Sequence, residues 1–426
     1  MKKNNYLLYD VNETPPVGKM VIFALQHVLA MFGATILVPI LVNSMAGRDV
    51  LTIPVALFTS GLGTIIYLIC TKGKSPVYLG SSFAFISPIA YAYLASGSSA
   101  VGMGIFVTGL VYIVFAILIK IFGKNWIDKI LPPLVIGPMI MIIGLGLAPS
   151  AVSQIGLSGE AIEIKGVIVA VVSFLTTALI STRAKGILKV IPFLMGILVG
   201  YILSIILGLV DFTTLNDASF FSIPKFILPF KDYSVSFTGI LTIVPIALVT
   251  IAEHIGDHIA LGSIIKKDLV KDPGLEKTLL GDGLATAVAG LLGGPANTTY
   301  GENTSVVGIT KVASTKVIFL AAIIAILISF FGKITGILAT IPNPVLGGVS
   351  LLLYGFIAVN GLKVIVQNKI DFDNLKNVIV TSAMLVIGLG GAVISITTKN
   401  INVSISGMSL AAVVGIILNL ILPDSK

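Results

Sequence analysis

Apolar runs of about 20 residues recur along the chain and are separated by short polar stretches. A helix of about 20 apolar residues crosses roughly 30 Å of hydrocarbon, so each run is long enough to span a membrane. The pattern predicts about fourteen spans. Their expected ranges are 20–42, 51–70, 77–95, 101–123, 130–149, 165–182, 187–209, 235–263, 279–293, 296–311, 317–338, 344–365, 376–394 and 404–422.

Two of these spans are interrupted by residues that resist a continuous helix. The third contains "YLGSSFAFISP" (78–88), and the tenth opens with "GGPANTTYGENTS" (293–305). Unwound backbone at membrane depth is tolerated where it lines a cavity or is buried in protein. The interruptions lie seven spans apart, and seven is odd, so the second half of the chain is expected to be inverted relative to the first. Paired interruptions in two inverted halves indicate the binding site of a transporter.

The basic residues agree with fourteen spans. With the N-terminus inside, 21 of the 27 Lys and Arg residues fall in inner loops and 6 in outer loops. This bias is what the positive-inside rule expects, and it places both termini in the cytoplasm. The net charge of +8 is therefore assigned to loops that face anionic lipid, and a nucleic-acid partner is not expected.

The amino-acid composition narrows the expected class of protein further. The chain is 56% hydrophobic and 11% charged, whereas a soluble domain carries roughly 25% charged residues. The alternating segments of about 10 residues that mark a β-barrel are absent from the sequence. The first apolar run is too long for a cleavable signal, and the single Cys70 excludes an internal disulfide framework. The expected class is an all-α protein that crosses the membrane many times.

Titratable side chains gather in the eighth span, in "TIAEHIGDH" (250–258). Glu253, Asp257 and Glu302 lie deepest in the expected spans, and intramembrane carboxylates usually face a cavity on a substrate or proton pathway. Glu253 and Asp257 are one helical turn apart on one face, and His254 and His258 are one turn apart on a face rotated by ~100°. The alternative is a structural role, in which these polar side chains only hold helices together. This alternative is strongest for Asp257, His258 and the lone His27 of the first span.

These groups suggest a class of ligand. Paired carboxylates accept hydrogen bonds from N–H groups, and the N–H groups of a broken helix can donate to carbonyl oxygens. Aromatic rings at Phe83, Tyr300 and Tyr354 are candidates to cover a flat face. A small planar molecule with alternating N–H and C=O edges fits, and uracil is the minimal example.

A metal-dependent intramembrane hydrolase is a second possibility, because His254 and His258 have the i, i+4 spacing of zinc ligands. The helix motif of such hydrolases requires a Glu directly after the first His, and Ile255 stands there. We therefore expect no catalytic residue, no metal and no cofactor.

Several stretches are specific enough to carry a resemblance over nearly the whole chain: "LQHVLAMFGATILVP" (25–39), "YLGSSFAFISP" (78–88), "IAEH" (251–254), "KKDLVKDPGL" (266–275), "NTTYGEN" (297–303) and "VSLLLYG" (349–355). The chain resembles the nucleobase–ascorbate transporter (nucleobase–cation symporter-2) family, most closely its bacterial uracil permeases. The resemblance implies a homodimer in the bacterial cytoplasmic membrane, built from two inverted seven-helix repeats with a core and a gate domain. The implied boundaries are a cytoplasmic tail at 1–19, core parts at 20–124 and 235–340, gate parts at 125–213 and 341–423, and an extracytoplasmic loop at 214–234.

The resemblance also implies roles for particular residues. Glu253 and Glu302 match glutamates that hydrogen bond to uracil, and Phe83 and Gly301 match residues whose backbone N–H groups contact the base. Tyr300 and Tyr354 match aromatic residues of the pocket. The implied activity is proton-coupled uracil uptake, with candidate proton carriers Glu253, His254, Asp257 and His258.

Two departures from the family pattern concern this site. Asp257 stands where relatives can carry a histidine linked to proton coupling, and Ser305 stands where the family signature usually has glycine. Purine-type members tend to have Gln in place of Glu302, so xanthine or urate is the alternative substrate.

Overall fold

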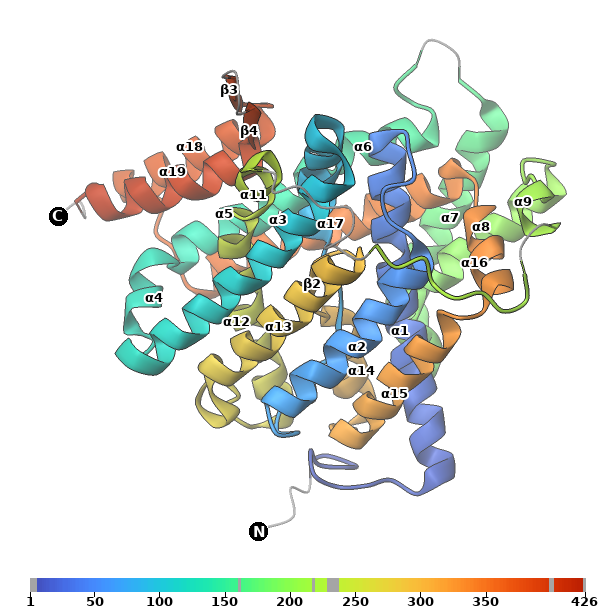
Figure 1. Ribbon diagram of the computed structural model, residues 1–426, viewed down its shortest axis with the longest axis horizontal. Helices are drawn as coiled ribbons and strands as arrows, with labels where there is room; N and C mark the ends of the chain where they lie inside the picture. The colour runs from blue at the N-terminus through green and yellow to red at the C-terminus, as the bar shows by residue number, and fades with distance from the viewer. Residues whose placement is uncertain (1–5, 160–161, 217–218, 228–236, 398–401, 424–426) are drawn as a thin grey trace.

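The computed structural model describes residues 6–159, 162–216, 219–227, 237–397 and 402–423. The expected segments 1–19 and 214–234 lie partly outside the described residues. Helices dominate, with two small antiparallel sheets (Figure 1). The elements of the first half are α1 (Val17–Ala46), α2 (Ile53–Cys70), β1 (Leu79–Ser81), η1 (Phe83–Phe85), α3 (Ile86–Phe122), α4 (Asn125–Ile130), α5 (Pro133–Gly146), α6 (Ala148–Ile155), α7 (Ile164–Arg183), η2 (Gly186–Val190), α8 (Pro192–Ile206) and α9 (Thr213–Asn216).

The second half also has a short strand between helices, and it has two further strands near its end. Its elements are α11 (Phe237–Ile243), α12 (Ile246–Ile265), η3 (Val270–Gly274), α13 (Leu275–Leu292), β2 (Asn297–Thr299), α14 (Gly301–Thr310), α15 (Thr315–Ile328), α16 (Gly332–Ala339), α17 (Asn343–Gln367), α18 (Leu375–Leu389), β3 (Val393–Thr397), β4 (Asn402–Ser406) and α19 (Gly407–Ile421).

The described part of the chain contains seven helices long and apolar enough to cross a membrane, or eight if α15 and α16, bent by 79°, form one span. Three further apolar helices, α8, α18 and α19, are shorter. The chain is therefore an all-helical membrane protein. Each expected apolar run contains helix, but several runs are short, bent or half extended, two are merged in α3, and α13 carries three charged residues, so fewer than fourteen qualify by length and composition.

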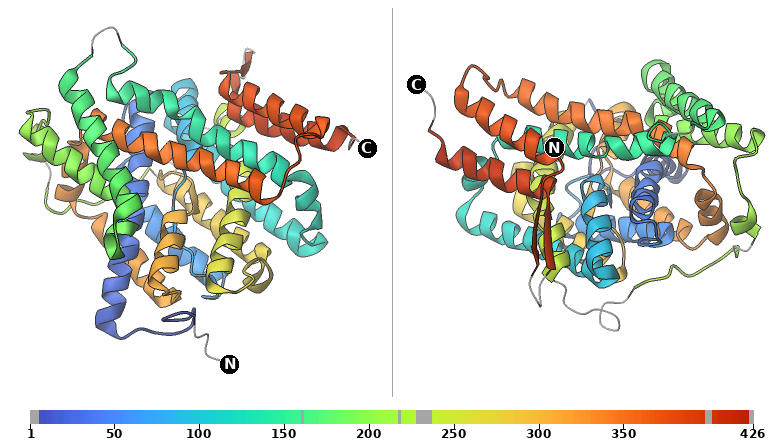
Figure 2. Two further views of the ribbon diagram at one scale, coloured as in Figure 1. Left: turned by 180° about the vertical axis from the view of Figure 1, so that it is seen from behind. Right: turned by 90° about the horizontal axis from the view of Figure 1, so that it is seen from above.

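Two expected boundaries differ from the structure. The third and fourth spans are joined in one helix, α3, whose only non-helical residue is Gly97 with a φ of 74°. The last two expected spans are trimmed by a β3–β4 hairpin, in which Val393 pairs with Ser406. The hairpin segments "VISIT" and "NVSIS" are rich in β-branched residues, which favour strands, but their hydropathy resembles that of a helix end. In Figure 2 the hairpin, α18 and α19 lie on the opposite side of the molecule from α9 and α16.

The two interrupted spans meet at the middle of the molecule. β1 pairs antiparallel with β2, with Gly80 opposite Thr298. Beyond the strands, the Ser82 N–H donates to the Ala296 carbonyl at 2.9 Å, and the Tyr300 N–H donates to the Tyr78 carbonyl at 3.1 Å. These bonds satisfy backbone groups that no helix satisfies, so unwound backbone can lie within the protein.

Small residues bring the surrounding helices close together. α13 packs against both α3 and α2 (Figure 1). A Cβ added to Gly109 of α3 would collide with the backbone of Gly283 and Ala287 in α13. Close backbone approach at small residues is the usual packing mode of membrane helices.

The segment 6–16, which we call the N-terminal strap, runs across the end of the molecule where the described chain begins (Figure 1). Tyr9 forms a parallel bridge with Val312, and its carbonyl accepts from the Ala313 N–H at 2.9 Å. The Lys267 ammonium donates to Asp10 at 2.7 Å. The strap therefore ties the end of α12 to the segment between α14 and α15.

Candidate functional site

A cavity of about 360 Å³ lies between two groups of elements. This volume is within the range of small-molecule sites, roughly 300–1,000 Å³. One wall comes from the segments around β1, β2, α12 and α14, and the other from α5, α7, η2, α8 and α17. The lining residues are Phe83, Ala84, Ile143, Ser181, Lys189, Pro192, Phe193, Glu253, Asp257, Thr298, Thr299, Tyr300, Gly301, Glu302, Ser305, Leu353, Phe356, Ile357 and Asn360.

Two helix N-termini reach this cavity from the crossed strands. β1 leads into Phe83 and α3, and β2 leads into Gly301 and α14. Neither start has a side-chain cap. The first N–H groups of a helix lack intrahelical partners and lie at the positive end of its dipole. Both starts can therefore donate hydrogen bonds to a ligand oxygen.

Tyr300 stabilises the pairing of β1 with β2, which we call the strand crossing. Its hydroxyl donates to the Ser81 carbonyl at 3.0 Å and accepts from Thr35 Oγ1 at 3.1 Å. A Cβ on Gly80 would collide with the Tyr300 ring, so glycine is needed for this close approach. Tyr300 thus lines the cavity with its hydroxyl already engaged.

Three carboxyl groups face the cavity: Glu253 and Asp257 from α12 and Glu302 from the first turn of α14. Thr299 Oγ1 donates to Asp257 Oδ2 at 2.5 Å, which links α12 to β2. Carboxylates that share a poorly hydrated space repel one another when all are ionised. The cavity therefore favours an N–H donor, or a proton, between these groups.

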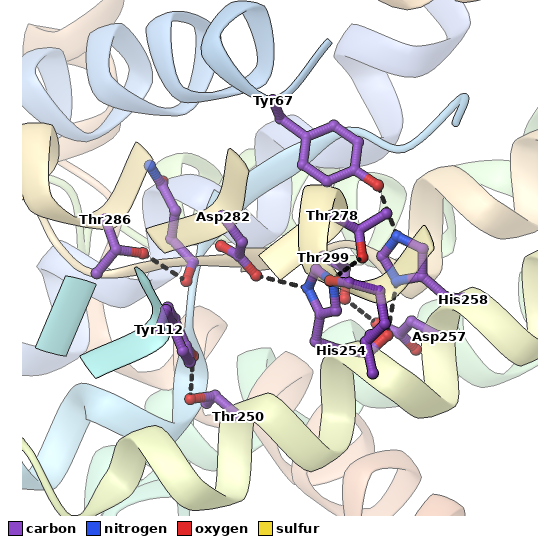
Figure 3. Close-up of polar contacts among 12 residues, drawn as sticks. Tyr67, Tyr112, Thr250, His254, Asp257, His258, Thr278, Asp282, Thr286 and Thr299 are labelled. Carbon is purple, nitrogen blue, oxygen red and sulfur yellow. Dashed lines mark hydrogen bonds and ion pairs between the residues drawn. The ribbon is translucent and has the colours of Figure 1, made fainter. Parts of the chain in front are cut away.

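The two histidines of α12 lie on a face of that helix rotated by ~100° from the face of Glu253 and Asp257, and Figure 3 shows their contacts. Both are fully buried, and neither is among the residues that line the cavity. His254 Nδ1 is 2.8 Å from Asp282 Oδ2, and His258 Nε2 is 2.6 Å from the Tyr67 hydroxyl. The structure thus separates the expected proton carriers into acids in the cavity and histidines behind it.

Asp282 was not among the sequence-based candidates. The expected ninth span begins at 279, which puts Asp282 near a membrane surface, but α13 begins at Leu275 and buries Asp282 completely. The available signal was an acid between two glycines in an otherwise apolar run, "LLGDGLATA".

Other candidates occupy different positions. Tyr354 is buried on α17 and is not part of the cavity lining, although the neighbouring Leu353 is. His27 is buried on α1, where its carbonyl accepts from Asn303 Nδ2 of α14 at 3.1 Å. Ser305 lines the cavity and donates to the Gly301 carbonyl at 3.0 Å. Among the residues that the structure describes, no group of three or more His, Cys, Asp or Glu side chains is placed to hold a metal ion.

Known proteins of the same size match this chain nearly end to end. The uracil permease of Bacillus subtilis (strain 168) is 47% identical over 423 residues, which is 98% of this chain and 95% of the relative. The uracil permease of Bacillus caldolyticus is 46% identical over 423 residues, with the same coverage. The uracil permease of Escherichia coli (strain K12) is 42% identical over 414 residues, covering 96% of this chain and 93% of the relative.

Solved structures with low sequence identity share the fold. The transmembrane domain of the cyanobacterial bicarbonate transporter BicA aligns with a TM-score of 0.63 at 14% identity, covering 96% of this chain and 99% of that domain. The structure of SLC26A9 aligns with a TM-score of 0.67 at 12% identity, covering 95% of this chain and 66% of that protein. The fold is thus one found in membrane transporters.

The sequence profile of the family described as "Permease family", the xanthine/uracil permeases, matches residues 18–397. Together with relatives that are more than 40% identical over nearly the full length, this match decides between the transporter and hydrolase hypotheses. The chain belongs to the xanthine/uracil permease (nucleobase–cation symporter-2) family and is a secondary transporter, not an enzyme.

Proposed function

We propose that this protein imports uracil together with protons across the bacterial cytoplasmic membrane. The observation that carries the proposal is the meeting of Glu253 and Glu302 with two uncapped helix starts, at Phe83 and Gly301, in one cavity. The near full-length relatives named uracil permease support the choice of base.

The donors and acceptors of the cavity complement those of uracil. The base has two N–H donors and two carbonyl acceptors in one plane. Glu253 and Glu302 accept from the N–H groups, and the backbone N–H groups of Phe83 and Gly301 donate to the carbonyls. Glu302 lies in the first turn of α14, where the helix dipole favours its ionised form as a base-reading acceptor.

Glu253 and Asp257 carry the coupled proton in this proposal. They are one turn apart on the same face of α12, so they share a proton as one group rather than titrating independently. The bond from Thr299 holds Asp257 towards β2 and therefore beside the bound base. The buried histidines do not line the cavity and have no part in contacting the substrate in this proposal.

Alternating access follows from movement between the two walls. The core parts 20–124 and 235–340 contain the crossed strands and the three acids, and the gate parts 125–213 and 341–423 supply the facing wall. Fourteen spans in two inverted repeats are supported by the crossing of β1 with β2 and by the fold shared with BicA and SLC26A9. We include a homodimer in the proposal because the family resemblance implies one.

The cavity opens towards the cytoplasm in this arrangement. Contacts among the expected inner loops, such as Lys74 with Asp272 and Asp10 with Lys267, gather these loops at one end of the molecule. Lys189, from another expected inner loop, lines the cavity and is exposed. By the positive-inside rule this end is cytoplasmic, so the conformation is inward-open.

Uptake of radiolabelled uracil by a bacterium that lacks its own uracil transporters tests the proposal. We expect accumulation that unlabelled uracil competes away and that a protonophore abolishes. Uptake of xanthine in place of uracil would refute the substrate, and uptake insensitive to the protonophore would refute the coupling.

A further inference from the structure

One face of α12 carries three polar side chains at successive turns: Thr250, His254 and His258. Residues at i, i+4 and i+8 lie in a row along a helix. We call this row the rear stripe, because the stripe of Glu253 and Asp257 faces the cavity. Figure 3 shows the rear stripe and its contacts.

Each member of the rear stripe bonds to a different helix. Thr250 accepts a short hydrogen bond from the Tyr112 hydroxyl of α3. His254 bonds to Asp282 of α13, and His258 bonds to the Tyr67 hydroxyl of α2. All six side chains are fully buried. Breaking any of these bonds would leave a buried polar group unsatisfied.

The histidine nitrogens in these bonds have defined roles. His258 Nδ1 is 2.7 Å from the carbonyl of His254, so it donates, and in the neutral ring Nε2 then accepts from Tyr67. His254 Nδ1 lies 2.8 Å from Asp282 Oδ2 and donates to it when that carboxyl group is ionised. The two rings stack with centroids 4.1 Å apart, so a charge on one ring opposes a charge on the other.

The face of α12 that carries Glu253 and Asp257 is held to β2 by the hydrogen bond from Thr299 to Asp257. The cavity occupies that side, and a Cβ on Gly256 would meet no atom within 4 Å. The helix starts after a break at Pro245 and ends at Ile265, where Lys266 follows with a φ of 55°. The three bonds of the rear stripe, to three different helices, therefore contribute strongly to fixing the rotation of α12 about its axis.

We propose that the rear stripe sets the rotation of α12, so that His254 and His258 are positioning residues that hold Glu253 and Asp257 towards the substrate. Adjacent residues on a helix differ by ~100° in direction, so even a fraction of that rotation would move the Glu253 carboxylate away from the base. The inference rests on the proposed function, because it takes the cavity as the uracil site.

Two substitutions of His254 separate positioning from proton carrying. The amide of Asn can donate to Asp282 from about the place of Nδ1 but cannot take up a proton in the physiological range, whereas Leu fills similar space without a donor. We expect His254→Asn to bind uracil within about twofold of wild type and His254→Leu to bind about tenfold more weakly, since the latter leaves Asp282 unpaired. Calorimetry in detergent measures the affinity, and uptake between pH 5 and pH 8 measures coupling.

The pH dependence of uracil accumulation decides whether the His254 ring positions α12 or carries a proton. Positioning predicts that His254→Asn keeps the wild-type pH dependence of uracil accumulation. If His254→Asn binds uracil normally but loses accumulation driven by a pH gradient, His254 carries a proton and the inference is overturned. Wild-type affinity in His254→Leu would overturn it as well.

A milder pair of variants keeps the test decisive if His254→Leu does not fold. Tyr67→Phe removes the hydroxyl that bonds to both His258 and Ser75, and we expect about threefold weaker uracil binding. The matched control is Tyr201→Phe, which removes a hydroxyl bond to Thr340, away from the cavity lining. Equal affinity in the two variants would overturn the inference.

The wild type is assayed first with uracil and xanthine. If it binds xanthine and not uracil, the proposed function fails, and the same comparison of variants with xanthine still decides whether the rear stripe positions α12.

Discussion

The two halves of the chain present the same geometry to the cavity but different chemistry. In each half a strand of three residues leads into a helix whose uncapped start reaches the cavity, at Phe83 or at Gly301. All three carboxyl groups of the cavity come from the second half. Where α12 has Glu253 and His254, the related stretch of α1 has Gln26 and His27. The repeat thus duplicates the backbone frame, and one copy supplies the ionisable groups.

His27 of the first half and His254 of the second half, which occupy related positions, also differ in their contacts. His254 bonds within its own half, to Asp282, and serves the helix that carries the acids. His27 contacts the other half, through Asn303, the residue after Glu302. The first half therefore supports the second half's binding groups, and variants in each half should fail in different ways.

The largest effect is expected for Glu302→Gln. The amide places a donor against a substrate N–H and removes a charge-assisted acceptor, so uracil binding should fall by more than about a hundredfold. Glu253→Gln is the comparator: it should damage accumulation but retain measurable equilibrium binding, because the protonated form of Glu253 resembles the amide. Calorimetry on both purified variants checks this, and equal loss of binding would remove the distinction between the two glutamates.

A first-half variant, Gly80→Val, should act through geometry alone. The added side chain would collide with the Tyr300 ring and shift the strand crossing, so we expect roughly tenfold weaker uracil binding with a lower melting temperature. Gly97→Ala is not a suitable control, because Gly97 has a positive φ; Gly146→Ala, which meets no neighbour within 4 Å, is suitable. Normal uracil binding in Gly80→Val would show that the crossing tolerates movement.

Asp257→Asn tests whether the acids of the second half also couple the proton. Uracil exchange needs no net proton transfer, so we expect exchange within about twofold of wild type and a flattened pH dependence of net uptake. Asp257→His, which places a second kind of proton carrier at this position, should keep coupled uptake with a moved pH optimum. If Asp257→Asn instead lowers only the melting temperature and keeps the wild-type pH profile, Asp257 is a structural partner of Thr299.

The smallest effect is expected where the halves touch outside the membrane. The hydrogen bond from the Lys74 ammonium, 2.7 Å away, holds the pKa of the Asp272 carboxyl below its usual value. A lowered pKa in the folded state stabilises the protein above about pH 4 and ceases to do so as the carboxyl is protonated at lower pH. Asp272→Asn should lower the melting temperature slightly at pH 7, with the difference vanishing near pH 3, and uracil affinity should not change. A change in uracil affinity would show that the contact between Lys74 and Asp272 influences the uracil site.

The positions of the helices and of both extended segments could be predicted from the sequence because they depend on local patterns. Apolar length marks the spans, and the glycines and proline around residues 80 and 295 mark the breaks. Pairings between distant residues could not be predicted in this way. The bond between His254 and Asp282 and the β3–β4 hairpin depend on which segments lie side by side, and hydropathy does not encode that.

The same distinction between local patterns and distant contacts separates the site residues that were predictable from those that were not. Glu253, Asp257 and Glu302 were predictable because charge inside an apolar run is locally visible. The burial of Tyr354 outside the cavity lining was not predictable, because it depends on the rotation of α17 against its neighbours. Burial of Asp282 depended on where α13 begins, and a shift of one helical turn in that boundary changes its environment from surface to interior.

The N-terminal strap carries a consequence for biosynthesis. Its hydrogen-bonding partners, at residues 267 and 311–316, are synthesised about 260 to 300 residues after it. The strap must therefore stay unpaired while α1 to α14 are synthesised. Only when the Lys311–Lys316 segment arrives can the strap fasten the ends of α12 and α14. The newly made protein thus passes through a stage in which α12 and α14, which carry the three acids of the cavity, are complete but are not yet joined at their ends by the strap.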